Sequence, residues 1–182
     1  MRAFLLLSCS LFGCTTMNPG TSDAPDQAPM PPPARPALYL GWFSPGGATG
    51  VTVTGISEGA EVHLVRSAEI GSGPCPLILD GLCLDLERPL RRFLPTESEP
   101  GGWAYIPVRV PASVAVGRTF ALQAAILDDE GAELTPAYDA TILEGGVCFG
   151  LYEPVCGLDG VTYSNSCVAE MAGMVIDYEG SC

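Results

Sequence analysis

The residues with the clearest chemical potential are four cysteines near the end of the chain. They lie among the last thirty-five of its 182 residues, with seven, ten and fourteen residues between successive members. Cysteines can bind zinc, but zinc sites typically contain pairs about two to four residues apart. No such pair occurs here, and the only histidine, His63, is remote in the sequence. We therefore expect structural disulfide bonds and no metal site in this segment.

The sequence around these cysteines predicts a small α+β unit. Two short apolar runs flank an Asp-Gly turn, which favours a hairpin over residues 155–163. Asn165 can cap a helix over 166–172, and Gly173 can supply the left-handed residue that ends it. A third strand is expected over 174–178. Because so small a unit cannot bury enough apolar surface to offset its chain entropy, we expect cross-links to stabilise it.

The most specific motif is the block CGLDGVTYSN, which begins at Cys156. With the cysteines on either side of it, this block resembles a Kazal domain, the fold of many serine-protease inhibitors. The family's first and fifth cysteines are both absent, and Met171 stands at the fifth position, so the loss leaves no orphan thiol. The resemblance covers the last fifth of the chain and implies two disulfide bonds, Cys148–Cys167 and Cys156–Cys182.

The resemblance also implies a protease-binding loop over residues 149–155. Family inhibitors present this loop to the active site of a protease in an extended form. Gly150 would then enter the specificity pocket, and the scissile bond would join Gly150 to Leu151. Tyr152 and Pro154 match the family's usual loop residues. Asn165 matches the asparagine whose side chain braces the loop in that family.

The glycine at position 150 leaves two functions open. Glycine inserts no side chain into a pocket, and compared with leucine it forgoes about 3 kcal/mol at about 0.8 kcal/mol per buried methylene. The first function is inhibition or binding of a serine protease. The second is a non-inhibitory binding or structural module of the cell envelope that uses the Kazal fold as a scaffold. An enzyme is not expected, because the single histidine provides no evident base for a nucleophile.

The start of the chain has the pattern of a signal peptide, residues 1–13. Arg2 precedes an apolar run of eleven residues, which is too short to span a bilayer. The run from Leu11 to Cys14 resembles a bacterial lipobox, which implies lipidation of Cys14. A similar pattern ends at Cys9, and an ordinary cleaved signal is the alternative. We expect an exported, lipid-anchored protein of the bacterial cell envelope, at the outer membrane or cell surface.

Residues 14–36 are expected to form a lipidated, proline-rich linker. Seven of the twenty-two residues from Thr15 to Pro36 are proline, and no apolar periodicity is present. Proline-rich linkers extend by about 3.1 Å per residue, so this one can reach up to about 70 Å. The linker would therefore hold the following domains away from a membrane surface.

Residues 37–144 have the pattern of an all-β domain. Apolar residues alternate with polar or small residues, as in strands that bury one face. The alternating stretches are 51–54, 61–64, 82–87, 106–110, 120–126 and 138–142. About seven or eight strands suit a β-sandwich, and the pattern is similar to immunoglobulin-like domains of bacterial surface proteins. Cys75 and Cys83 are close enough in sequence for a local disulfide bond.

The expected fold class is therefore an all-β, immunoglobulin-like sandwich followed by a small disulfide-rich α+β domain. The sandwich occupies residues 37–144 and the Kazal-like domain residues 145–182. No motif indicates a cofactor or a small-molecule substrate. The expected partners are a serine protease and, through the lipid anchor, a membrane.

The charge of the chain restricts its partners further. Eight arginines, no lysine and 21 acidic residues give a net charge of −13. Nucleic acid is not expected as a partner, because the negative net charge would repel its phosphates over most of the surface. After Arg118 the chain has eleven acidic residues and no basic side chain, so this half would be attracted to a basic protein surface. Arg88, Arg91 and Arg92 form a small basic cluster, for which a solvated turn and an anion site are the two interpretations.

Overall fold

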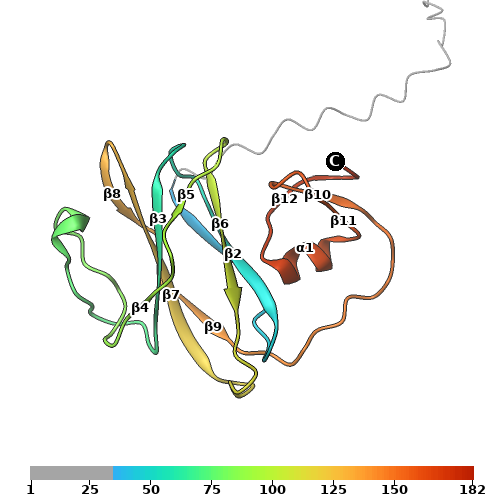
Figure 1. Ribbon diagram of the computed structural model, residues 1–182, viewed down its shortest axis with the longest axis horizontal. Coiled ribbons are helices and arrows are strands. Elements are labelled where there is room, and N and C mark those ends of the chain that lie inside the picture. The colour runs from blue at the N-terminus through green and yellow to red at the C-terminus, as the bar shows by residue number, and fades with distance from the viewer. Residues whose placement is uncertain (1–34) are drawn as a thin grey trace, which may run out of the picture.

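The computed structural model describes residues 35–182. The expected signal peptide, the lipidation site Cys14 and nearly all of the expected linker lie outside the described residues. Two bodies of structure pack side by side, a larger β domain and a smaller C-terminal unit (Figure 1). Within the described part of the chain, no helix is both long and apolar enough to cross a membrane.

The β domain contains two antiparallel sheets. The first sheet has the strand order β1-β2-β6 and consists of β1 (Ala37–Leu40), β2 (Ala48–Thr54) and β6 (Trp103–Arg109). The second sheet is built around β3 and β7, which pair along the whole of β3. Its strands are β3 (Glu61–Ser67), β4 (Arg91–Arg92), β5 (Thr96–Glu97), β7 (Thr119–Asp128), β8 (Gly131–Leu134) and β9 (Tyr138–Thr141).

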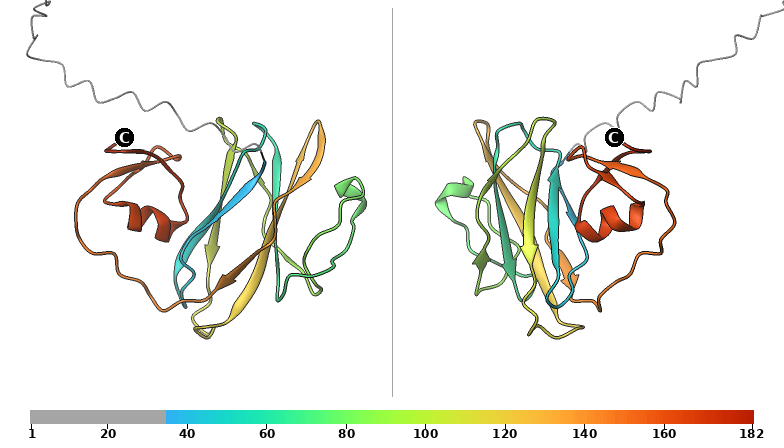
Figure 2. Two further views of the ribbon diagram at one scale, coloured as in Figure 1. Left: turned by 180° about the vertical axis from the view of Figure 1, so that it is seen from behind. Right: turned by 45° about the vertical axis from the view of Figure 1, so that its right-hand side comes forward.

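The two sheets lie face to face over one hydrophobic core (Figures 1 and 2). Val51 and Val53 of β2 point into this core, and Leu122 of β7 meets them from the other sheet. The rings of Phe43 and Phe120 pack edge to face with their centroids 5.2 Å apart. The mostly-β architecture predicted from the period-two pattern is therefore present. In each sheet, alternate side chains point into the core between the sheets.

The second sheet also buries part of its outer face. The segment between β3 and β4 folds back over β7 and forms a second apolar cluster with it. This cluster contains Val65, Leu79, Leu84, Leu86, Ala121 and Ala125. The buried Gln123 side chain of β7 holds this covering segment in place, because its Nε2 donates to Asp85 Oδ2 at 3.1 Å and its Oε1 accepts from the Asp85 N–H at 2.9 Å.

The strand predicted over residues 82–87 is wrong. A short 3-10 helix, η1 (Leu77–Leu79), and the Cys75–Cys83 disulfide bond give this segment an irregular path. Its backbone bonds join Leu84 to the nearby segment around Gly73 rather than to a sheet strand. The alternation of leucines there arises because Leu84 and Leu86 of this covering segment are buried in the second apolar cluster, against the outer face of the second sheet. Periodicity alone does not distinguish such a cover from a strand.

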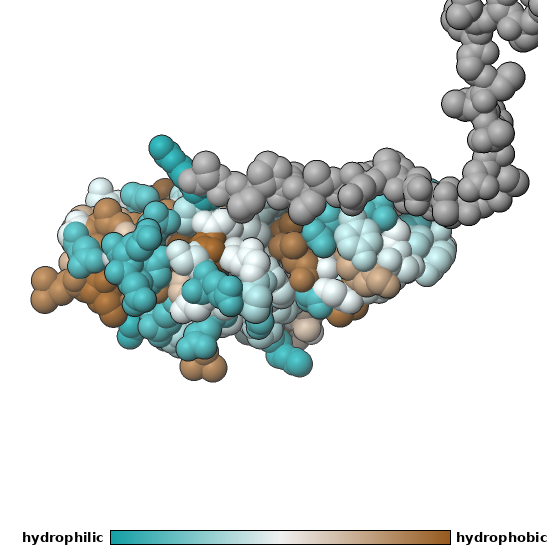
Figure 3. All heavy atoms as spheres, turned by 90° about the horizontal axis from the view of Figure 1, so that it is seen from above, coloured by the Kyte–Doolittle hydropathy of each residue, from teal (hydrophilic) through white to brown (hydrophobic). Residues whose placement is uncertain are grey.

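An apolar tip marks the end of the β domain that carries η1. Leu77 is 97% exposed and Ile78 is 63% exposed. Hydrophobic atoms project at this end of the molecule (Figure 3). The C-terminal unit lies at the opposite end, so the tip has no contact with it (Figure 1).

The C-terminal unit is a three-stranded sheet with one helix. Its elements are β10 (Val155–Gly157), β11 (Thr162–Tyr163), α1 (Ser166–Ala172) and β12 (Ile176–Glu179), with the sheet order β11-β10-β12. Asn165 caps α1 by accepting a hydrogen bond from the Val168 N–H, and Gly173 ends the helix with φ 76°. These are the caps that the sequence predicts. The third strand begins at Ile176, two residues after its predicted start.

Candidate functional site

The loop between Cys148 and Cys156 is exposed and is tied down at both ends. Phe149 is 90% exposed, Leu151 64% and Tyr152 69%. Disulfide bonds join Cys148 to Cys167, at the start of α1, and Cys156 to Cys182. The helix α1 lies between this loop and β2, so the loop faces away from the β domain (Figures 1 and 2).

Asn165 braces the loop from the start of α1. Its Nδ2 donates to the carbonyl oxygen of Phe149 at 3.2 Å and to that of Leu151 at 2.9 Å. Its Oδ1 accepts from the Val168 N–H at 3.1 Å, which caps the helix. One side chain thus connects the first turn of α1 to the residues on both sides of Gly150.

Gly150 forms the apex of the loop. The Leu151 N–H donates to the Phe149 carbonyl at 2.9 Å, which makes a three-residue γ-turn centred on Gly150. A Cβ added at Gly150 would have no atom within 4 Å, and its φ does not lie in the left-handed region. The free protein would therefore accommodate any L side chain at this position.

Backbone hydrogen bonds hold the second half of the loop. The Glu153 N–H donates to the Ser164 carbonyl at 3.0 Å, and the Gly180 N–H donates to the Pro154 carbonyl at 2.7 Å. Tyr152 directly precedes these two attachments and remains exposed. The backbone of the loop is therefore supported on both sides of its apex.

Met171 stands at the position where the resemblance to the Kazal family implies a fifth cysteine. Its thioether sulfur lies 3.1 Å from the Sγ atom of Cys148, which is already bonded to Cys167. Cys148 therefore has no thiol proton, and the contact is a packing contact between two sulfur atoms. Met171 thus fills the space near the loop's base without a covalent link.

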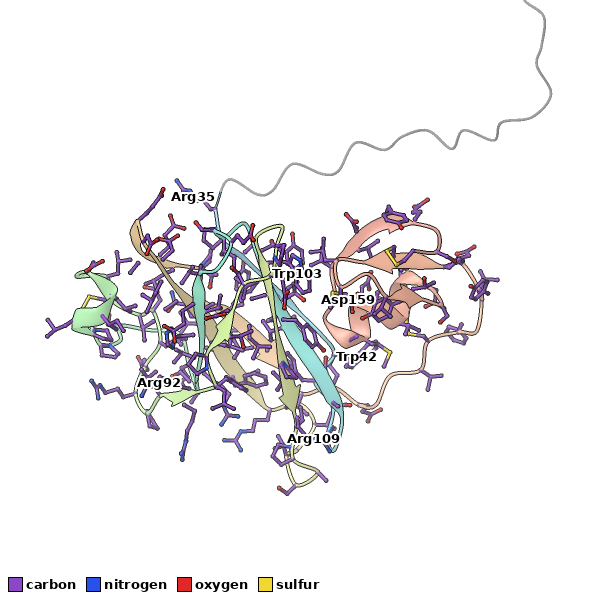
Figure 4. All side chains as sticks on the ribbon, turned by 45° about the horizontal axis from the view of Figure 1, so that its top comes forward. Arg35, Trp42, Arg92, Trp103, Arg109 and Asp159 are labelled. Carbon is purple, nitrogen blue, oxygen red and sulfur yellow. A yellow bond between two sulfur atoms is a disulfide. The ribbon has the colours of Figure 1, made fainter. Side chains whose placement is uncertain are left out.

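Residues of the β domain donate hydrogen bonds to the C-terminal end of α1. The carbonyl oxygen of Met171 accepts from the Trp42 N–H at 3.0 Å and from Thr49 Oγ1 at 2.7 Å. The last carbonyl groups of a helix have no partner within the helix, so these donors satisfy a group that would otherwise need water. Trp42 lies at the boundary between the two bodies (Figure 4).

Two further hydroxyl groups bind the next carbonyl groups of the chain. The Tyr105 hydroxyl donates to the Ala172 carbonyl at 3.1 Å, and Thr52 Oγ1 donates to the Gly173 carbonyl at 2.6 Å. Thr52 is completely buried. Three successive carbonyl groups at the end of α1 thus receive four hydrogen bonds from the β domain. We call this set of contacts the junction.

Glycines allow the two backbones to approach closely at the junction. A Cβ on Gly173 would clash with the Gly50 carbonyl oxygen and would lie 2.8 Å from the Gly41 nitrogen. A Cβ on Gly41 would lie 2.6 Å from the Gly173 nitrogen. Only residues without a Cβ fit such a contact, which makes the junction specific in its geometry.

Two tyrosines near the junction keep their hydroxyl protons to high pH. Burial, the Tyr163 hydroxyl's 2.9 Å hydrogen bond to Asp159 and the Asp159 charge raise the pKa of Tyr163 to about 12. Burial, followed by the charge of Asp159, also raises the pKa of Tyr105. Tyr105 therefore remains a hydrogen-bond donor to Ala172 across the neutral range.

A metal site is not formed by the described residues. Within 35–182, no group of three or more His, Cys, Asp or Glu side chains is arranged to hold an ion. His63 lies on β3 in the β domain, and its Nε2 is 3.4 Å from Glu61 Oε1. Its side chain is 19% exposed and is therefore half-buried.

A family model supports the nature of the C-terminal unit. Residues 136–174 match the Kazal-type serine protease inhibitor domain. No curated protein matches the chain. The C-terminal part of the chain therefore carries a Kazal-type domain, a class of domain that binds serine proteases and does not act as an enzyme.

Sequence reasoning did not find the residues of the junction. Thr49, Thr52 and Tyr105 lie in strands of the first sheet and are remote from the cysteine motif. A glycine inside a strand often marks a close approach of another backbone, and Gly50 in β2 is such a glycine. Gly50 is the one signal that could have indicated this contact.

Proposed function

We propose that the protein inhibits a serine protease by presenting residues 149–155 to the active site of that protease. The observation that most strongly supports this role is the Asn165 side chain, which donates to the carbonyl groups on both sides of Gly150. A loop held in shape before binding loses less conformational entropy when it binds. The exposure of Phe149, Leu151 and Tyr152 leaves the loop free to make the contact.

In the proposed complex, Gly150 lies at the specificity pocket and the Gly150–Leu151 peptide bond faces the nucleophile of the protease. Cutting that bond would not release either half of the loop, because both Cys148 and Cys156 are disulfide-bonded to the body of the domain. Asn165 would hold the two new ends close together. The cut and intact forms would then stay close to balance in the active site, which keeps the protease occupied.

The glycine at the apex favours a protease with a narrow specificity pocket. A deep apolar pocket would remain unfilled, at a cost of about 3 kcal/mol relative to leucine. The exposed neighbours Phe149, Leu151 and Tyr152 would supply apolar contacts on both sides of the pocket. Affinity would thus come mainly from the flanks of the loop.

The proposal includes the location and the wider architecture. The chain would be a bacterial lipoprotein with a signal peptide, a lipid on Cys14 and a linker that ends at residue 36. The lipid would hold both domains at the cell envelope. The same proposal divides the chain into one domain of residues 37–144 and another of residues 145–182. It gives the first domain an immunoglobulin-like fold, which the strand order β1-β2-β6 supports. Mass spectrometry of the mature N-terminus tests the anchor, since any first residue other than a lipid-bearing Cys14 would remove it.

A second candidate function is a non-inhibitory binding or structural module. The glycine at position 150 favours it, because this residue offers nothing to a specificity pocket. Under this function the Kazal-type fold would be a stable scaffold for another contact of the cell envelope. The loop would then bind no protease, whatever side chain stands at its apex.

The test is a titration of subtilisin-like, elastase-like and trypsin-like proteases with the full exported chain. We expect inhibition of at least one of them, with any cleavage confined to Gly150–Leu151. Gly150→Arg should shift inhibition toward proteases with an acidic pocket, whereas the matched control Gly145→Arg, at an open glycine outside the loop, should not. Failure of both wild type and Gly150→Arg against the whole panel would leave the module function.

A further inference from the structure

Five arginines gather around two adjoining hollows of the β domain. One hollow has a volume of about 340 Å³ and the other about 270 Å³. Both are lined by Arg66 and Arg91, and both have Phe120 and Pro111 in their walls. The remaining arginines at the two hollows are Arg92, Arg109 and Arg118. We call these five residues and the two hollows the arginine site.

No acidic side chain balances these charges where they gather. Neither hollow is lined by an Asp or Glu. Within residues 35–182, no arginine lies within 4.0 Å of a carboxylate oxygen, since the single contact of this kind is between His63 and Glu61. The chain has 21 acidic residues and only eight basic ones, so an uncompensated group of five arginines needs an explanation. Such a group creates a local positive potential in an otherwise negative protein.

The strand register works against stability at the arginine site. Arg66 of β3 stands directly opposite Arg91 of β4 in an antiparallel pair. Like charges at directly opposed positions destabilise a sheet. This pairing therefore costs electrostatic free energy, and binding of an anion between the two side chains would relieve the repulsion.

The floor of the arginine site is apolar and fixes one guanidinium group. The Cζ atom of Arg66 lies 5.9 Å from the centre of the Phe120 ring, which is itself 9% exposed. A guanidinium group over an aromatic ring is held by a cation–π interaction. Phe93 and Val114 continue the apolar wall of the second hollow. The site thus combines anion-binding groups at its rim with an apolar floor.

We propose that the arginine site binds two neighbouring phosphate groups on a partly apolar frame, either within one molecule or in the headgroups of two adjacent lipids. Guanidinium groups match phosphate oxygens with two parallel hydrogen bonds, which makes arginine suited to phosphate. Two hollows that share Arg66 and Arg91 provide places for two neighbouring phosphates. Arg92 and Arg109 project from the β domain, on a different body from Asp159 of the Kazal-type domain (Figure 4). This site is therefore separate from the loop 149–155.

The experiment uses the full chain with inorganic pyrophosphate and, separately, with vesicles of phosphatidic acid in phosphatidylcholine. Calorimetry measures the first binding and vesicle flotation the second. A soluble diphosphate as the natural source predicts binding of pyrophosphate, and a lipid headgroup predicts binding to the phosphatidic acid vesicles but not to pure phosphatidylcholine. The affinity should fall as salt rises, because the contact is ionic.

Matched variants decide whether binding belongs to this site. The double variant Arg66→Gln, Arg91→Gln should weaken binding at least about tenfold, because each substitution removes charge-assisted hydrogen bonds. The control Arg35→Gln changes charge in the same direction at an exposed arginine outside both hollows. A melting temperature near that of the wild type would show that the double variant folds. Absence of binding to both probes, or equal losses in Arg35→Gln, would overturn the proposal.

Discussion

The loop 149–155 and the C-terminal end of α1 belong to the same small domain but differ in almost every physical respect. The loop is exposed and is braced by one side chain, Asn165. The helix end is covered by the first sheet and receives four hydrogen bonds from the β domain. The domain therefore separates its support from the surface it presents, and α1 connects the two.

The junction stands where the Kazal family would have part of a third disulfide bond. The backbone carbonyl of Met171, at the family's fifth cysteine position, accepts two of the four hydrogen bonds. Four hydrogen bonds at about 1 kcal/mol each give about 4 kcal/mol, similar to the roughly 2–4 kcal/mol typical of a disulfide bond. The hydrogen bonds of the junction are thus comparable in energy to the covalent link that the resemblance to the Kazal family implies near this position.

The largest expected effect concerns the close backbone contact at the junction. Gly173→Ala should destabilise the chain by about 3 kcal/mol or more, because the new Cβ clashes with Gly50 in addition to the left-handed strain of about 1–2 kcal/mol. Urea unfolding of the full chain measures this loss. The matched control is Gly160→Ala, which has φ 71° and no atom within 4 Å of its Cβ. Equal losses in the two variants would mean that the contact adds nothing.

A smaller effect is expected from one hydroxyl group of the junction. Thr52→Val keeps the shape of the side chain but leaves the Gly173 carbonyl without its donor, which should cost about 2 kcal/mol. Thr54→Val is the control, because the buried Thr54 Oγ1 has no hydrogen-bond partner within the described residues. The control should be neutral or stabilising. Thermal unfolding that ranks the two variants the other way would contradict the role of Thr52.

Asn165 allows the loop brace to be separated from the helix cap. Asn165→Asp keeps an oxygen acceptor for the Val168 N–H but loses the donors to Phe149 and Leu151. Stability should change by less than about 1 kcal/mol, while the loop becomes more susceptible to proteolysis. Asn165→Ala should lose the cap as well, at a cost of about 1 kcal/mol. Unchanged proteolysis of the loop in both variants would show that it needs no brace.

The smallest expected effect is the pH dependence of the tyrosines. The folded pKa of Tyr163 is about 12, above its ordinary 10.0, so folding favours the neutral phenol. Its contribution to stability is therefore fully present below pH 10 and is lost as the pH rises through 12. Tyr163→Phe should show a smaller decline of unfolding free energy over this range. An identical decline in the variant would assign it to other groups.

Local chemistry made the Kazal-type domain predictable from the sequence. The block CGLDGVTYSN indicates the family directly, and Asn165 and Gly173 indicate the limits of α1 through their capping preferences. The β domain is predictable as mostly β because Val51 and Val53 alternate with threonines. These signals depend only on neighbours in the chain.

The junction was not predictable, and of the arginine site the sequence indicated only Arg91 and Arg92, because both features depend on which elements meet in space. The threonines of β2 alternate with valines, as on the solvent-facing side of a strand, yet Thr52 is fully buried because α1 covers it. Arg66 is far from Arg109 and Arg118 in the sequence and meets them only through the pairing and packing of strands. The leucines from 82 to 86 alternate like a strand but belong to a cover.

The central claim is that a supported loop offers Gly150 to the specificity pocket of a serine protease. The most direct test is the inhibition constant of Gly150→Leu, in the full chain, against a protease with a deep apolar pocket. The account predicts inhibition tighter than the wild type by up to about a hundredfold, or about 3 kcal/mol, with no change in Gly145→Leu. A folded Gly150→Leu chain that leaves the protease uninhibited, or that is cut at Gly150–Leu151 and released as a substrate, would contradict it.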